Sequence, residues 1–294
     1  MKRLTQVLFI QMLYDRFWQE VSGKCNSVDY CLENDRIREK VLPLQPIKNN
    51  KLYKEVKKTV KNINESKKIA RIAGIWYLVL AIGAGYSWMF ITNIYVDGNA
   101  TLTAENIVRS EFRYVIAIIS GIIGQLGFIL LGLTLYRLFK QVNEHISKIM
   151  VTLVLISVPI TFSAIIIETG ALIVLKRADY LNVFTTEQIH SIAMTFVSLH
   201  IEGIHIVTIF WGLWLFPLAY LVYKSNFIPK VFVILLILSG ICYCIGSISP
   251  LTNPVFYAKI EYILSIPEAV GEVSLLLWLL IKGVSVKKIH CQEH

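Results

Sequence analysis

The chain has 294 residues, 55% of them hydrophobic, and carries a formal net charge of +9. Its mean hydropathy of +0.59 is too high for an ordinary soluble domain. Residues 1–68 hold 15 Lys and Arg against 8 Asp and Glu, so a net charge of +7 lies in this first stretch. No nucleic-acid-binding motif accompanies the basic residues, so a nucleic-acid partner is not expected.

Residues 1–66 are predicted to form a basic cytoplasmic extension. Lysines gather just before the first apolar segment, at Lys48, Lys51, Lys54, Lys57, Lys58, Lys61, Lys67 and Lys68. Such a cluster attracts anionic lipid headgroups by about 1 kcal/mol for each lysine near the membrane surface. The alternative is a solvated linker whose charges only set the orientation of the chain.

Six later segments are apolar and long enough to cross a bilayer, which takes about 20 helical residues. They lie near 72–95, 114–136, 150–175, 199–223, 230–249 and 262–282. The sequence therefore predicts an all-α fold, a polytopic transmembrane bundle of six spans that occupies residues 67–284. Residues 285–294 are expected to be a cytoplasmic tail. The lipid bilayer is the predicted environment of this bundle.

The orientation follows from the basic residues in the short connections. One side collects eleven: Lys67, Lys68, Arg71, Arg137, Lys140, Lys148, Lys224, Lys230, Lys282, Lys287 and Lys288. The other side has five: Arg109, Arg113, Lys176, Arg177 and Lys259. Both termini are therefore predicted to be cytoplasmic. On the outer side, Asn99-Ala100-Thr101 is interpreted as a turn.

Several residues within the spans predict how the helices begin and pack. The glycines of the second span, Gly121, Gly124, Gly127 and Gly132, favour close helix approach. Pro159 and Pro217 lie inside the third and fourth spans, where neighbours must satisfy the freed carbonyls. Thr185 and Gln188 form a capping-box pattern that predicts a helix start near Thr186. The tryptophans Trp211, Trp214 and Trp278 are interpreted as packing or interface residues.

Ionisable residues within the predicted spans are the candidate site. Carboxylates and imidazoles are costly in hydrocarbon, so they mark functional positions by default. The helical rise places His205, Glu168 and Glu268 about 10 Å from the outer ends of their spans. Glu202 with His205, and Glu268 with Glu272, each share a helix face, whereas His200 lies about 200° from Glu202. Gln125 falls near the middle of the second span.

Three interpretations of this cluster stay open. The first is a structural or ligand-binding module, in which a buried hydrogen-bond network locks the helices or holds a small ligand. The second is a membrane-embedded metal-dependent hydrolase with Glu202, His205, Glu268 and Glu272 as ligands, and Glu168, His200 and Gln125 as neighbours. A divalent metal is not favoured over none. The third is a small-solute or proton-coupled transporter.

The stretch LHIEGIHIVTIFWGLWLFPLAYLVYKSNFIPK, residues 199–230, resembles the family called domain of unknown function 4386. KKIARIAGIWYLVLAI, GQLGFILLGLTLYRLF, ADYLNVFTTEQ and IPEAVGEVSLLLWLLIKGV are similar to that family too. The resemblance covers about residues 66–284. It implies a multi-pass protein of the bacterial cell (inner) membrane, because the members are bacterial polytopic proteins without an assigned activity.

Overall fold

The computed structural model describes residues 51–176 and 179–284. The chain divides into two compact units, and the membrane-spanning bundle lies in the unit that runs from Lys61 to Lys287. Most of the predicted basic extension, residues 1–50, and the predicted tail, residues 285–294, lie outside the described residues. Helix α4 begins at Lys51, so it contains the later lysines of the basic stretch.

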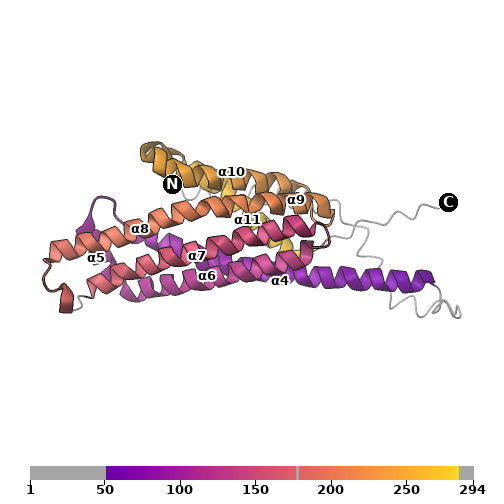
Figure 1. The fold of residues 1–294 in the computed structure, drawn as a ribbon, viewed down its shortest axis with the longest axis horizontal. Helices are drawn as coiled ribbons and strands as arrows, with labels where there is room; N and C mark the ends of the chain where they lie inside the picture. Colours follow the sequence, from indigo (N-terminus) through magenta and orange to yellow (C-terminus); the bar gives the residue numbers. More distant parts are fainter. Residues whose placement is uncertain (1–50, 177–178, 285–294) are drawn as a thin grey trace. The chain divides into compact units, whose positions relative to one another are not determined.

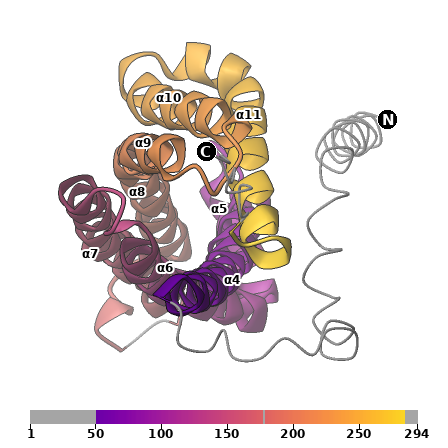
Figure 2. The ribbon, with the colours of Figure 1, turned by 90° about the vertical axis from the view of Figure 1, so that its right-hand side faces the viewer.

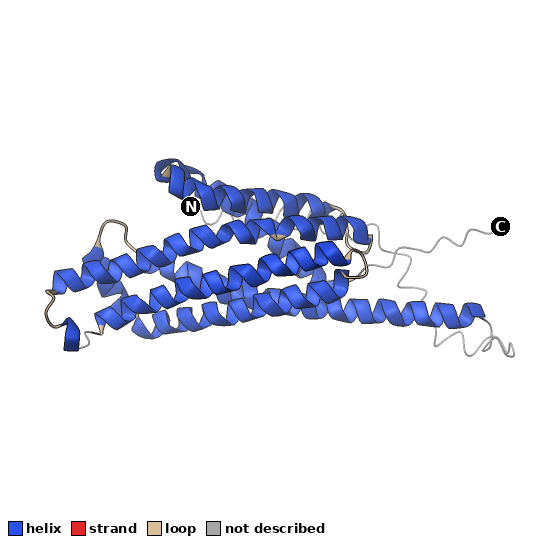
Figure 3. Cartoon of the chain, viewed as in Figure 1, coloured by secondary structure: helices blue, strands red, loops and turns tan. Residues whose placement is uncertain are grey.

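The described residues contain helices and no strand (Figures 1 and 3). The helices are α4 (Lys51–Ile94), α5 (Ala100–Arg109), α6 (Glu111–Phe139), α7 (Glu144–Leu175), α8 (Thr186–Leu213), α9 (Leu215–Ser225), α10 (Val231–Thr252) and α11 (Pro254–Ile281), with a 3₁₀ turn η2 (Asp179–Leu181). By length and composition they supply six membrane spans, with α8 and α9 forming one span together. This confirms the predicted all-α bundle of six spans.

The helices extend beyond the apolar segments from which they were predicted. Helix α8 begins at Thr186 and α11 at Pro254, whereas the expected spans began at residues 199 and 262. The apolar run marks only the part of a helix that suits hydrocarbon, and polar helical turns continue past it. The predicted start near Thr186 is confirmed. Thr185 accepts from the Gln188 N–H, and the Gln188 side chain accepts from the Thr185 N–H.

The interpretation of Asn99-Ala100-Thr101 as a turn is wrong. Asn99 is the N-cap of α5, and its side-chain oxygen accepts the N–H of Leu102 at 2.9 Å. Such a cap satisfies one of the free N–H groups at the start of a helix. The preceding turn is at residues 97–98, where Gly98 has a φ of +69°. The connection 96–113 therefore contains a helix.

The fourth span is two helices instead of one. Helix α8 ends at Leu213 and α9 begins at Leu215, with Trp214 between them. Pro217 lies in the first turn of α9. A proline has no N–H and its ring clashes with the carbonyl four residues earlier, here that of Leu213, so it interrupts the helix there. In contrast, α7 continues through Pro159.

Six spans surround a common interior when the bundle is viewed along its helices (Figure 2). The predicted close approach of α6 is confirmed. The N–H of Ala84 on α4 lies only 2.7 Å from where a Cβ on Gly124 would be, and Val154 on α7 is 3.2 Å from the equivalent point on Gly132. A second crossing brings α8 and α10 together, since the carbonyl of Gly240 lies 2.7 Å from the Cβ position of Gly212. Small residues thus set the helix spacing.

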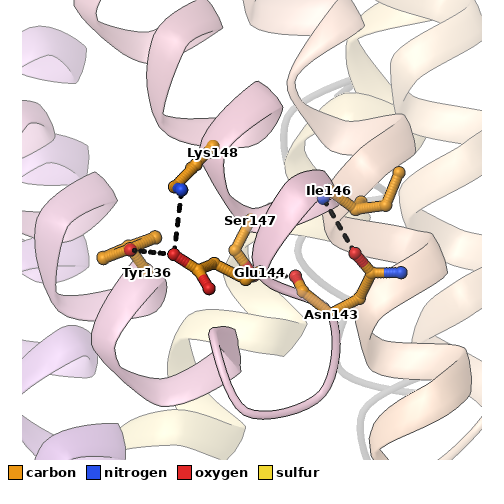
Figure 4. A network of polar contacts seen from close by, with 6 residues as sticks. All are labelled: Tyr136, Asn143, Glu144, Ile146, Ser147 and Lys148. Carbon is orange, nitrogen blue, oxygen red and sulfur yellow. Dashed lines mark hydrogen bonds and ion pairs between the residues drawn. The ribbon is translucent and has the colours of Figure 1, made fainter.

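The turn between α6 and α7 carries the basic residues Arg137, Lys140 and Lys148, and a network of polar contacts orders it (Figure 4). Asn143 caps α7 by accepting the N–H of Ile146 at 3.0 Å. Glu144 pairs with Lys148 at 2.9 Å and accepts from the hydroxyl of Tyr136 at 3.5 Å. Both charged side chains are mostly exposed. This network orders a surface turn and lies apart from the interior.

We expect two glycine-to-alanine changes to act in opposite directions. A Cβ on Gly124 would meet backbone atoms of α4, so Gly124→Ala should lower the free energy of unfolding by about 1–3 kcal/mol. A Cβ on Gly85 would meet nothing within 4 Å, so Gly85→Ala should be neutral or raise it by about 0.5–1 kcal/mol. Unfolding of both variants in detergent measures the difference. Equal stabilities would contradict the assigned α4–α6 contact.

Candidate functional site

A cavity of about 480 Å³ lies inside the bundle. All six spans contribute to its wall, with residues from α4, α6, α7, α8 with Trp214, α10 and α11. Most of the wall is apolar or aromatic. Its aromatic members are Tyr77, Trp88, Phe128, Trp211, Trp214, Tyr243 and Tyr257. Pockets of this size, with apolar walls and a few polar groups, are typical of small-molecule sites.

Glu272 joins three helices at one end of the cavity. One carboxylate oxygen accepts from the Tyr77 hydroxyl at 3.0 Å, and the other accepts from the Tyr243 hydroxyl at 2.7 Å. These bonds connect α11 to α4 and to α10. Tyr77 also packs edge-on against Trp214, with ring centroids 6.2 Å apart. The carboxylate is therefore held in place by polar and apolar contacts together.

A line of acidic residues on α11 faces the cavity. Glu261, Glu268 and Glu272 all belong to the wall, and their spacings of seven and four residues keep them on one helix face. Glu268 is half-buried, and no hydrogen bond or ion pair forms between it and any other described residue. Glu261 is exposed at the outer part of the wall. Its spacing of seven residues before Glu268 was the sequence signal that could have identified it.

His205 faces this cavity and Glu202 does not, although the two residues share part of a helix face. His205 belongs to the wall and packs edge-on against Trp88 and Tyr257. Glu202 is absent from the wall, and its side chain is 51% exposed. Its carboxylate lies 3.6 Å from His205 Nδ1, which is too long for a hydrogen bond and leaves Nδ1 without such a partner among the described residues.

His200 faces the same cavity and is anchored by α7. Its Nδ1 lies 3.0 Å from the carbonyl oxygen of Ala164. A carbonyl can only accept, so Nδ1 carries the proton and Nε2 of the neutral ring is an acceptor. The buried carboxylate of Glu168 lies 3.4 Å from the same Nδ1, behind the cavity wall. The Ala164 bond is shorter, so Glu168 has the imidazole as a neighbour and no hydrogen bond among the described residues.

Gln125 brings one further polar group to the cavity. The residue is 2% exposed and belongs to the wall. Its Oε1 has no hydrogen-bond partner among the described residues. Buried side-chain acceptors usually have a partner, so an unpaired one in a cavity wall indicates a group that a bound molecule could satisfy.

The cavity opens sideways between α4 and α11. Every exposed residue of its wall lies on one of these two helices: Ala81, Gly85, Glu261, Ser265, Ala269 and Val273. The two helices are joined at the lysine-rich end, where the backbone at Leu280 lies 2.7 Å from the Cβ position of Gly74. They are joined again by the bond from Tyr77 to Glu272. Beyond this bond the wall includes the small residues Ala81, Ala84 and Gly85 of α4, of which Ala81 and Gly85 are exposed.

The sequence identified part of this wall. The structure brings Gln125, His200, His205, Glu268 and Glu272 to one cavity, and leaves Glu202 and Glu168 outside its wall. The interpretation of Trp211 and Trp214 as packing or interface residues missed their place in the wall. Tyr77, Tyr243 and Gly85 were also missed, because their role depends on how separate helices meet.

The predicted metal site has no compact ligand group in the described part of the chain. No three His, Cys, Asp or Glu side chains among residues 51–176 and 179–284 lie in position to hold one ion. Of the four predicted ligands, His205, Glu268 and Glu272 share the cavity wall. The metal site stays a prediction.

Together these features define a class of protein, a multi-pass membrane protein whose helical bundle encloses a cavity open to the side. Within that class the chain belongs to the family described as "Domain of unknown function (DUF4386)", whose family model matches residues 72–283. This confirms the resemblance found in the sequence. Comparison with curated proteins and with solved structures finds no match.

The bond from Tyr243 to Glu272 is expected to contribute measurably to stability. Tyr243→Phe removes a donor at 2.7 Å from a carboxylate and should lower the free energy of unfolding by about 1–3 kcal/mol. Tyr262→Phe, at an exposed position of α11, is the matched control and should change little. Thermal unfolding of both variants tests this. Equal loss in the two variants would refute the role of the bond.

Metal analysis tests the remaining prediction of a metal site. If a divalent ion is bound, purified wild-type protein should contain it in stoichiometric amount, and His205→Ala should lower the content because it removes an imidazole ligand. Elemental analysis after extensive dialysis gives the number. Absence of metal from the wild type, or an unchanged metal content in His205→Ala, would refute the predicted metal site.

Proposed function

We propose that this protein is a membrane module that binds a small molecule in the cavity between its six spans. The observation that carries the proposal is the cavity itself, about 480 Å³ with aromatic walls and a few polar groups. A cavity that only completed a packed core would be filled by side chains, since protein interiors are close-packed. The side opening between α4 and α11 gives the molecule a route from the bilayer.

The polar network supports a preformed site. Glu272 is fixed by two tyrosines, and His200 is fixed by the carbonyl of Ala164. A site whose polar groups are already positioned binds without the cost of ordering them. Glu268 and Gln125, by contrast, have unused hydrogen-bonding capacity toward the interior.

The proposed location is the bacterial cell (inner) membrane, with both termini in the cytoplasm. Resemblance to bacterial polytopic proteins supports the membrane, and the excess of Lys and Arg at one end of the spans supports the orientation. That basic end would also contact anionic lipid headgroups, including those near α4. A decrease of vesicle binding with rising salt concentration would test this contact.

The binding function is preferred to the transporter and hydrolase alternatives. A transporter must expose its site to the two aqueous sides of the membrane in turn, which requires conformations other than the one described. The exposed wall residues described here all lie on α4 and α11, around one opening. A metal hydrolase needs a ligand group that the described residues do not assemble. A binding module requires neither feature.

Filling the cavity should abolish binding without harming the fold. Gly85 belongs to the wall, and a Cβ there meets nothing within 4 Å, so the leucine of Gly85→Leu should occupy the cavity mouth. The probes are three naphthalenes: 2-naphthylmethylamine, 2-naphthylmethanol and 2-naphthoate. For each probe that binds the wild type, we expect Gly85→Leu to weaken the binding by about tenfold or more. Equilibrium dialysis of detergent-purified protein measures this.

The matched control is Ile82→Leu, because Ile82 is a neighbouring residue of α4 that is exposed and outside the wall. It should bind as the wild type does. The proposal fails if none of the three probes binds the wild type, or if Gly85→Leu and wild type bind equally.

A further inference from the structure

We infer that the cavity is selective for a protonated amine with an apolar body. The inference rests on the proposed binding function and names the chemical class of its ligand. Three features of the wall carry it: the sign of its charges, its unpaired hydrogen-bond acceptors and the nature of its apolar surface.

The charged residues of the wall are all acidic. Glu261, Glu268 and Glu272 belong to it, and no Lys or Arg is among the described residues that line the cavity. An anion would therefore face carboxylates with only the imidazoles of His200 and His205 as basic groups in the wall, and like charges repel strongly where the dielectric is low. A cation instead supplies the partner that a carboxylate inside a membrane needs.

Three unused hydrogen-bonding groups of the wall are acceptors, and the buried Nε1–H of Trp211 is an unused donor. Glu268 has no partner among the described residues, and Gln125 Oε1 has none either although the residue is almost fully buried. His200 has its proton on Nδ1, committed to Ala164, so Nε2 of the neutral ring also accepts. A ligand that satisfies these three acceptors must donate hydrogen bonds. An ammonium has up to three donors and a positive charge.

The rest of the wall suits the apolar body of such a ligand. Trp88 and Tyr257 pack edge-on against His205, and Trp211 packs edge-on against Tyr243, the tyrosine that donates to Glu272. Aromatic rings attract cations through their negative faces, and they also provide large apolar contact surfaces. The wall thus offers acceptors for the ammonium of an amphipathic amine and aromatic surfaces for its apolar body.

The acidic residues also mark a path from the opening inward. Glu261 is exposed at the mouth, and Glu268 lies seven residues farther along α11, roughly 10 Å by the helical rise. Glu272 follows one turn later, but its two oxygens already accept from Tyr77 and Tyr243. We therefore assign Glu268 as the carboxylate that pairs with the ammonium.

The three naphthalene probes separate charge from shape, because the amine, the alcohol and the carboxylate share one apolar ring system. At pH 7 the amine is a cation, the alcohol neutral and the carboxylate an anion. In equilibrium dialysis the wild type should bind 2-naphthylmethylamine about tenfold or more tightly than the alcohol, and the carboxylate least. Glu268→Gln should remove most of the preference for the amine over the alcohol and leave the alcohol affinity nearly unchanged.

The matched control is Glu144→Gln, the same change at an exposed carboxylate in the α6–α7 turn (Figure 4), and it should bind all three probes like the wild type. If Glu268→Gln does not fold, Glu261→Gln serves as the second variant and should reduce the preference for the amine less strongly. Retention of folding is checked by size-exclusion chromatography.

Two kinds of result would overturn the inference. The alcohol or the carboxylate could bind as tightly as the amine or more tightly, and Gly85→Leu could still abolish that binding. The cavity would then be a binding site, but not one selective for amines. An undiminished preference for the amine in Glu268→Gln would refute the assigned pairing. Absence of binding by all three probes would refute the proposed function itself.

Discussion

The carboxylate of Glu272, held between the hydroxyls of Tyr77 and Tyr243, determines where this bundle can be open. A charged or polar group inside a membrane must find its partners within the protein, because hydrocarbon offers none. Glu272 finds them on α4 and α10, so three helices are joined at one level. On the lysine-rich side of this level, α4 and α11 are in close contact through Gly74. On the other side they part, and the cavity opens between them.

Glycines act with this network to shape the interior. Gly124 lets α6 approach α4, and Gly212 lets α8 approach α10, so the backbones nearly touch at two crossings. Gly85 has the opposite role, since nothing fills the space where its side chain would be. The same residue type therefore closes the bundle at some positions and leaves it open at another. The difference depends on whether a neighbouring helix faces the glycine.

The sequence predicted the fold well because the determinants of a membrane bundle are local. Apolar length predicts a span, and the Thr185 and Gln188 pair predicts a helix start. Asn99 was misinterpreted because a cap and a turn use the same residue type. The break at Trp214 arises from Pro217, but α7 continues through Pro159, so a proline alone does not decide whether a helix breaks.

The candidate site was only partly predictable, because its composition depends on contacts between distant helices. Helical periodicity placed Glu268 and Glu272 on one face, and both are in the wall. It also paired Glu202 with His205, yet only His205 faces the interior. Periodicity gives the angle between two side chains but not the direction of the neighbouring helices. For the same reason the tyrosines that hold Glu272 could not be found, since they lie 195 and 29 residues away from it in sequence.

The side opening has a consequence for how occupancy of the cavity is controlled. Its exposed residues lie on α4 and α11, both long and apolar enough to cross a membrane, so a ligand of the proposed site would enter from the lipid phase. Occupancy then follows the mole fraction of ligand dissolved in the lipid, rather than its concentration in water. An aqueous titration would therefore return an apparent affinity that shifts with the amount of lipid in the sample, even though the site itself is unchanged.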